Sequence, residues 1–375
     1  MNKELSTYMA DQAIQLVNAE EDAGLLHINF PDKWVAASTM QKAIRRGEAV
    51  IAKSAAIFLS QVDARMLRRR LAVIAIEDVG VASTWHVGVT VYACLKISSI
   101  PEKQRLCVYL ACASALANAA KERSGDQLQT ALMTNPCLRS DIDALSELEV
   151  GQLRDIMLDS KNGLIERTIA GWFLAGVPSR EYRNFPDVDG DRELYLYSLE
   201  SLHIPFWMPA VVAMSAPVVH EPMFWTFPIK VDHLAADEMQ VVNHELPHTV
   251  DTFGVPHYAL DRHTRIGKAA VRALIAGSNE LRDFLGQNVG GGSVQQTLEW
   301  ALFTLEGGRL NREAVFSASE DIKRLGQETD MCQYGLRVEA QKDLLTLLLT
   351  QMDNLHDIRA ELIMKAMKDG GSYNG

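Results

Sequence analysis

The chain has 375 residues, of which 47% are hydrophobic, and this length and composition allow a large core and predict two domains. Aromatic residues make up only 7%, while Ala, Leu, Met and Glu are frequent, which favours a mainly α-helical fold. A formal net charge of -11 argues against a general nucleic-acid coat protein and confines any nucleic-acid contact to a local basic patch.

The cysteines and the N-terminus bear on the cellular compartment. The chain contains no C-x-x-C pair, so we expect the five cysteines to be free thiols buried in a reducing cytosol. The N-terminus lacks the uninterrupted apolar run of a signal peptide. No run reaches the roughly 18 apolar residues needed to span a bilayer. We therefore expect a soluble, cytoplasmic protein with no membrane contact.

Helical periodicity dominates the first half of the chain. The pattern predicts helices over 3–23, ended by Gly24, and over 38–60, with Ser38 or Thr39 as N-cap. A third helix over 64–79 is expected to stop at Gly80, and a fourth runs from Pro101 to about Lys121. Further helices are expected over 141–159 and 163–175. We assign residues 1–176 to one helical domain.

The composition changes near Gly176. Residues 177–262 hold many of the prolines and most of the histidines, so we expect a loop-rich segment with at most short strands, at 211–212 or 218–219. The aromatic run at 222–228 is expected to cover a core. Helices are predicted to resume over 263–285, 294–306, 311–325 and 334–367, with a flexible glycine link at 290–292. Residues 263–368 then form a C-terminal helical domain, and 369–375 a disordered tail.

Two groups of basic residues are candidate phosphate-binding sites. Lys42, Arg45 and Arg46 lie within one turn of a predicted helix and can hold phosphates, or can form a solvated face paired with acids such as Glu48. The second group lies where a helix is expected to begin, near Asp261 or Thr264, and contains Arg262, His263, Arg265 and Lys268. Its alternative is a capped surface helix in which Asp261 is the cap.

A third group of basic residues lies between these two groups in the sequence. Arg68, Arg69 and Arg70 are consecutive, so they fan around their helix and cannot all face one ligand. We expect at least one of them to pair internally with Glu77 or Asp78. For that acidic pair, a structural role is favoured over chemistry.

Two blocks of this region carry a family resemblance. Residues 38–47, S-T-M-Q-K-A-I-R-R-G, resemble the S-A-L-Q-K-A-I-R-R-G signature of the RarA/MgsA family. Residues 68–83, R-R-R-L-A-V-I-A-I-E-D-V-G-V-A-S, resemble that family's A-R-R-L-V-x-x-A-x-E-D-I-G-L-A-D/S block at a similar separation. The family comprises AAA+ ATPases related to clamp loaders that act at stalled replication forks.

The resemblance covers about residues 38–120 and implies a clamp-loader-collar-like helical bundle that assembles into tetramers. The family's ATPase half is not matched, because no G-x-x-x-x-G-K-[ST] run occurs in the sequence. Its S-P-K-S-N-x-A-Y block is also replaced, by A-A-K-E-R-S-G at 119–125. ATP hydrolysis therefore does not carry over to this chain.

Six of the ten histidines lie between His220 and His263. Residues 244–248 read H-E-L-P-H, the H-E-x-x-H pattern of zinc proteases, in which two histidines share one helical face. Pro247 disrupts the helix that this motif needs. The metzincin extension also fails, because Asp251 and Gly254 stand where a glycine and a third histidine are required. We expect no metal and no cofactor.

The leading hypothesis is a non-ATPase accessory protein of DNA replication, recombination or repair. It would form a homo-oligomer and bind DNA and replication or repair proteins. One alternative is a metal-dependent hydrolase that uses the histidine-rich segment, namely His244, Glu245, His248, His257, Asp261 and His263. Another is a purely structural assembly subunit. No nucleophile–base–orienter set can be assembled from the sequence, so an enzymatic function is not favoured.

Overall fold

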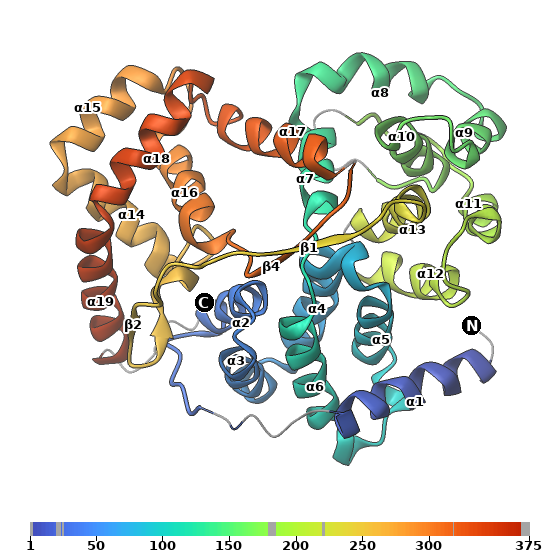
Figure 1. Ribbon diagram of the computed structural model, residues 1–375, viewed down its shortest axis with the longest axis horizontal. Coiled ribbons are helices and arrows are strands. Elements are labelled where there is room, and N and C mark those ends of the chain that lie inside the picture. The colour runs from blue at the N-terminus through green and yellow to red at the C-terminus, as the bar shows by residue number, and fades with distance from the viewer. Residues whose placement is uncertain are drawn as a thin grey trace.

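The computed structural model describes residues 3–19, 24, 26–178, 185–219, 222–317 and 319–368. It is mainly helical, which confirms the expected fold class, and its described strands are short. Figure 1 shows two lobes with an extended two-stranded ribbon running between them. The predicted disordered tail, 369–375, and His220 lie outside the described residues.

The N-terminal lobe is formed by the first part of the chain. Its α-helices are α1 (Lys3–Ala19), α2 (Lys33–Arg46), α3 (Ala49–Val62), α4 (Ala64–Ile74), α5 (Thr84–Leu95), α6 (Arg105–Asn118), α7 (Ser124–Thr134), α8 (Arg139–Ser146), α9 (Val150–Leu158), α10 (Leu164–Leu174), α11 (Arg192–Ser198), α12 (Met208–Val219) and α13 (Met223–Leu234). Short segments between them are the π-helical η1 (Ala75–Val79) and the 3₁₀ turns η2 (Gly80–Ser83), η3 (Ile97–Ser99), η4 (Glu102–Gln104), η5 (Pro136–Leu138) and η6 (Leu199–Ser201).

The C-terminal lobe is formed by helices α14 (Arg265–Gly277), α15 (Asn279–Asn288), α16 (Val294–Leu302), α18 (Gln341–Thr350) and α19 (Met352–Lys368), with the 3₁₀ turn η9 (Val338–Ala340) and the π-helical η8 (Phe303–Gly307). Helix α17 (Ser319–Cys332) crosses to the other lobe and packs on α7 (Figure 1). The strands are β1 (Gln240–Asn243), β2 (Asp251–Thr252), β3 (Val255–Pro256) and β4 (Arg312–Val315), and η7 (His257–Ala259) follows β3.

The ribbon between the lobes is the antiparallel pair β1–β4. Gln240 lies opposite Val315, and Asn243 lies opposite Arg312. On its other side β4 meets the chain between α6 and α7, where the Lys121 amide donates to the Arg312 carbonyl at 2.8 Å. The second strand pair, β2–β3, is a small hairpin. Through the ribbon, the segments around residues 240 and 315, which lie far apart in the sequence, are held together beside α2 and α7.

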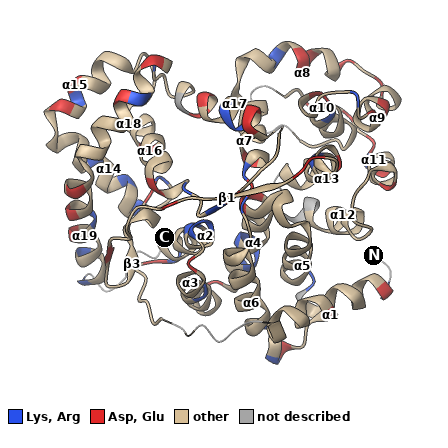
Figure 2. Cartoon of the chain, viewed as in Figure 1, with Lys and Arg blue, Asp and Glu red and all other residues tan. Residues whose placement is uncertain are grey.

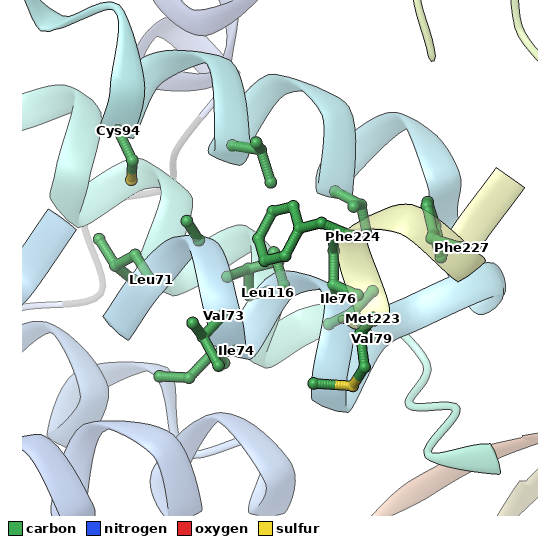
Figure 3. Packing of buried hydrophobic residues seen from close by; sticks show 14 of the residues in the cluster. Leu71, Val73, Ile74, Ile76, Val79, Cys94, Leu116, Met223, Phe224 and Phe227 are labelled. Carbon is green, nitrogen blue, oxygen red and sulfur yellow. The ribbon is translucent and has the colours of Figure 1, made fainter. Parts of the chain in front are cut away.

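The larger hydrophobic cluster lies mainly in the N-terminal lobe and also includes Ile266, Ile322 and Ile363 of the C-terminal part of the chain. In the N-terminal lobe, Figure 3 shows Leu71, Ile74 and Val79 from α4 and η1 packed with Phe224 and Phe227 of α13. The expected core role of the aromatic run is therefore confirmed. A second buried cluster joins α14, α15, α16, α18 and α19. One described stretch, Ala64–Leu95, is long and apolar enough by composition to cross a membrane, and 61% of its most apolar window is buried inside the protein.

Helix α2 differs from its prediction at both ends. Its N-cap is Asp32, whose carboxylate accepts from the backbone amides of Trp34 and Val35. The predicted caps, Ser38 and Thr39, are instead buried in the helix interior. The predicted single helix over 38–60 is also wrong, because Gly47 adopts a left-handed φ of 75° and ends α2 before α3 begins.

Other departures come from tertiary packing. The segment expected to be loop-rich contains α11, α12 and α13, and the expected strands at 211–212 and 218–219 are part of α12. Pro228 lies inside α13, where burial of the neighbouring Phe227 and Ile229 outweighs its missing amide donor. Residues 312–315 form strand β4 instead of the predicted helix, because the edge of β1 and the chain at Lys121 pair with them. Cys94 and Cys112 are buried as expected, whereas Cys107, Cys137 and Cys332 are exposed.

Candidate functional site

Four of the seven predicted phosphate-binding residues converge on one pocket between the lobes. The pocket has a volume of ≈ 350 Å³, and Lys42, Arg45, Arg262 and His263 all line it. The first two residues come from α2 and the others from the loop before α14. Figure 2 shows Lys and Arg positions along α2 and α4 in the middle of the molecule, close to the ribbon. The structure therefore joins the two basic groups that the sequence separates by more than 200 residues.

The other predicted residues do not line this pocket. Arg46 turns the opposite way: its guanidinium pairs with Glu48 at 3.0 Å, donates to the Pro247 carbonyl at 2.7 Å and stacks over the ring of Tyr258. Arg265 and Lys268 are exposed on α14. The N-cap of α14 is Thr264, whose hydroxyl accepts from the Gly267 amide at 2.9 Å, and not Asp261, which pairs with Lys42 instead.

Two arginines that sequence reasoning did not propose as site residues also line the pocket. Arg70 comes from α4, and Arg123 precedes α7. The sequence does not distinguish Arg70 from Arg68 and Arg69. Three consecutive residues point in different directions from a helix, and which of them points into the pocket depends on the helices packed beside it. The remaining lining includes the acids Glu77 and Asp126 and the aromatic residues Trp34, Trp300 and Phe303.

Lys42 is neutralised inside the protein. Its ammonium lies 2.8 Å from the Asp261 carboxylate and donates to the Ser38 hydroxyl, and both charged side chains are buried. Burial lowers the pKa of Lys42 even though Asp261 opposes the shift. Burial alone would raise the pKa of Asp261, but Lys42 and His263 outweigh it and lower this pKa to about 2. The geometry, a short buried contact, makes an ion pair the dominant state at neutral pH.

Arg45 and Arg123 are held by the acidic pair of η1. The Arg45 Nε donates to Asp78 at 2.6 Å, and its Nη2 donates to Glu77 at 2.8 Å. The Arg123 Nε lies 3.0 Å from Asp78, and its Nη2 pairs with Asp126. Among the described residues, the partners of this acidic pair are Arg45 and Arg123, and not Arg68 or Arg70 as the sequence led us to expect.

Arg70 and Arg262 differ from the other cations of the pocket because they form no close ion pair in the part of the chain that the structure describes. Within the described ranges, neither guanidinium lies within ion-pair distance of a carboxylate. Arg70 donates to the Gln41 side chain, and Arg262 packs over the rings of Trp300 at 4.5 Å and Tyr334 at 5.7 Å. Arg70 Nε, Arg262 Nη1 and Trp300 Nε1 are buried donors with no hydrogen-bond partner in the described part of the chain. Unsatisfied buried donors of this kind favour an acceptor ligand.

The two π-helical segments of the described chain both border this pocket. Segment η1 supplies Glu77, and η8 supplies Phe303. Arg45 connects them, because it binds Glu77 and Asp78 on one side and donates to the Gly307 carbonyl at 2.8 Å on the other. π-Helical turns occur frequently at functional sites, since they re-aim side chains at a cost in helix stability.

Several ionisable groups in the cleft have shifted pKa values. Burial and the neighbouring Asp78 raise the pKa of Glu77 to about 7. His263 lines the pocket and is exposed, yet the surrounding protein desolvates its ring and, with Lys42 and Arg262 nearby, lowers its pKa to about 4 despite Asp261. The imidazole of His263 is therefore neutral at pH 7.

A second cavity of ≈ 380 Å³ adjoins the first and shares Arg123, Asp126, Trp300 and Phe303 with it. Its lining includes Asp330 of α17, whose pKa is raised to about 7 by burial and by the charge of Asp126. The cleft thus contains two carboxyl groups, Glu77 and Asp330, that change charge near neutral pH.

The residues of the proposed hydrolase site do not form a metal centre in the described part of the chain. Residues 244–248 are not helical, so the face that H-E-x-x-H requires does not form, in line with the effect expected of Pro247. His244 binds Glu313 at 2.8 Å, and the His257 ring contacts His356 of α19. Among the described residues, no group of three or more His, Cys, Asp or Glu side chains is placed to hold a metal ion.

Comparison of the chain with protein-family models, with curated proteins and with solved structures finds no match.

Proposed function

We propose that this protein is a non-ATPase accessory of DNA replication, recombination or repair, located in the cytoplasm, that assembles into a homo-oligomer and binds DNA and replication or repair proteins. The pocket between the lobes is the proposed DNA contact. The resemblance of residues 38–47 and 68–83 to the RarA/MgsA signature supports the cellular role, and the pocket supports the binding.

The observation that carries the proposal is the convergence of cations in one pocket of an acidic protein. The formal net charge is -11, yet five cationic residues and His263 line one cavity: Lys42, Arg45, Arg70, Arg123 and Arg262. Lys42, Arg45 and Arg123 are paired with carboxylates of the protein. The attraction for a phosphate therefore depends on Arg70 and Arg262, which lie beside aromatic rings. Such a site binds phosphates locally and weakly, because the rest of the surface repels DNA. It loses affinity as salt rises, because each phosphate contact releases counterions and salt screens the attraction.

The test measures binding of forked and single-stranded DNA to the purified full chain by fluorescence anisotropy, at about 50 mM and at about 200 mM salt. We expect binding at the lower concentration and its loss at the higher one. The double variant Arg70→Gln, Arg262→Gln should abolish binding. The matched control Arg154→Gln, on the exposed face of α9, should bind as the unchanged protein does.

Light scattering on the same samples measures the oligomer. A monomer that does not bind DNA at low salt would falsify the proposal. A stable oligomer without DNA binding would instead identify a purely structural assembly subunit. Binding that survives the pocket variant but is lost in Arg265→Gln, Lys268→Gln would move the contact to α14.

A further inference from the structure

We propose that the pocket between the lobes binds a single nucleotide with a free terminal phosphate, held between Arg70 and Arg262, with its base against Trp34. The inference rests on the proposed function and narrows it, because the ligand would be the phosphorylated end of a strand or a free nucleoside monophosphate. Both present the same chemical group to the pocket.

The size of the pocket favours one small ligand. Its volume of ≈ 350 Å³ lies near the lower end of the range of small-molecule sites, roughly 300–1,000 Å³. Its walls come from α2, α4 and α7 of the N-terminal lobe and from α16 and η8 of the C-terminal lobe. A terminal nucleotide enters such a cavity, whereas the middle of a duplex remains outside it.

The free charges select a phosphate. A guanidinium offers several N–H donors in a planar fork that matches phosphate oxygens. Arg70 Nε and Arg262 Nη1 are buried donors that the described residues leave without acceptors. Both cations also act on His263, whose pKa they lower, so the two guanidinium groups lie near the same imidazole. One phosphate near His263 would supply acceptors to both.

The carboxylates in the pocket argue against a strand that passes through it. Glu77 and Asp126 line the same cavity, so successive backbone phosphates would meet negative charge as well as positive charge. A single phosphate can contact the free guanidinium groups alone. The carboxylates then remain as acceptors for N–H and O–H groups of the base and sugar.

The pocket also has an aromatic side chain on which the base of a nucleotide can stack. Trp34 lines the pocket, and 49% of its surface is exposed, although it belongs to the otherwise buried helix α2. An exposed indole beside a cationic cavity is suited to base stacking, which tolerates any base.

Calorimetry on the full chain tests the inference with deoxyadenosine monophosphate, deoxyadenosine and inorganic phosphate as probes. We expect the nucleotide to bind most tightly, because only it supplies both the phosphate and the base. A short single strand with a 5′-phosphate, one with a 3′-phosphate and one with neither then distinguish a strand end from a free nucleotide. Equal affinity for nucleotide and nucleoside, or for nucleotide and inorganic phosphate, overturns the proposal.

Matched variants test the residues. Arg70→Gln and Arg262→Gln should each weaken nucleotide binding roughly 10- to 100-fold, the effect of losing a hydrogen bond to a charged group. Their controls are Arg69→Gln and Arg272→Gln, which change exposed residues of the same part of the molecule that do not line the pocket. Trp34→Ala should weaken nucleotide binding and leave phosphate binding unchanged.

Melting temperatures show whether each variant folds, and Arg70→Lys and Arg262→Lys replace any that does not. These lysine variants should retain intermediate affinity, because the charge remains while the fork is lost. If pocket and control variants bind the nucleotide equally well, the proposal fails. DNA binding that ignores a terminal phosphate would overturn this inference alone, whereas nucleotide binding without DNA binding would overturn the proposed function alone.

Discussion

Charged residues buried in α2 depend on partners that are distant in the sequence. Lys42 forms an ion pair with Asp261, and Arg45 forms one with Asp78, each at hydrogen-bond distance. The attraction within such pairs largely offsets the cost of removing both charges from water, so they fix geometry more than they add stability. Their loss would leave a single buried charge, which explains why a helix with this sequence is fixed in one orientation between the lobes.

Glu77 makes stability depend on pH. Burial and Asp78 raise its pKa from 4.5 to about 7, so the folded state holds this proton more tightly than the unfolded chain does. Its contribution to stability is therefore complete below the unfolded pKa and is lost as pH rises through about 7. Glu77→Gln is neutral at every pH, and we expect it to be more stable than the unchanged protein by about 2–3 kcal/mol at about pH 8.

Urea unfolding of both proteins at about pH 5 and about pH 8 measures this difference. At the lower pH the two free energies of unfolding should nearly coincide. A constant gap at both values would show that the carboxyl group of Glu77 is ionised throughout.

The sequence predicted part of the candidate site and could not have predicted the rest. Lys42 and Arg262 were identified because cations at helical spacing, or before a helix, are visible in one short window. Arg70 and Arg123 were missed because their role depends on which partners the fold places beside them. Whether a guanidinium is neutralised, as for Arg45, or left free, as for Arg262, is decided by contacts that cross the whole chain.

At the scale of elements, Gly47 sets the direction in which the chain leaves α2. Its φ of 75° is left-handed, and an added Cβ would lie 2.1 Å from the Asn311 side-chain nitrogen. Gly47→Ala should lower the free energy of unfolding by about 2 kcal/mol, of which roughly 1–2 kcal/mol is the left-handed backbone. Gly277→Ala at the end of α14 is the control, because its Cβ would meet no atom within 4 Å.

Denaturant unfolding compares the two glycine variants. The control should change stability by no more than about 1 kcal/mol and in the stabilising direction, since alanine restricts the unfolded chain. Equal effects of the two substitutions would contradict the role assigned to Gly47. The helices themselves were well predicted where apolar spacing was regular, as in 163–175, and poorly where packing overrode propensity, as in 208–219.

At the scale of the whole molecule, two elements that follow the proposed domain boundary at 262–263 pack against residues that precede it. Helix α17 packs on α7 so closely that a Cβ on Gly326 would lie 2.5 Å from the Gln127 Cβ. Strand β4 pairs with β1 and with the chain at Lys121. These contacts couple the C-terminal segment to the N-terminal lobe.

We therefore expect the fragment 263–368 to lack a cooperative unfolding transition when it is produced alone. Loss of α7 and β1 would expose the apolar face of α17 and the edge of β4 to water. Circular dichroism during urea unfolding measures this. A sharp transition would instead establish the predicted domain boundary.

The two π-helical turns beside Arg45 have a consequence for how this chain tolerates changes in length. A π turn accommodates one residue more than the α-helix around it. Removing one residue from 75–79 or from 303–307 would let the helix close into regular geometry and rotate every later side chain of that turn by about 100°. Relatives of this protein that share its cleft should therefore keep the residue count of both turns, even where the loops around them vary in length.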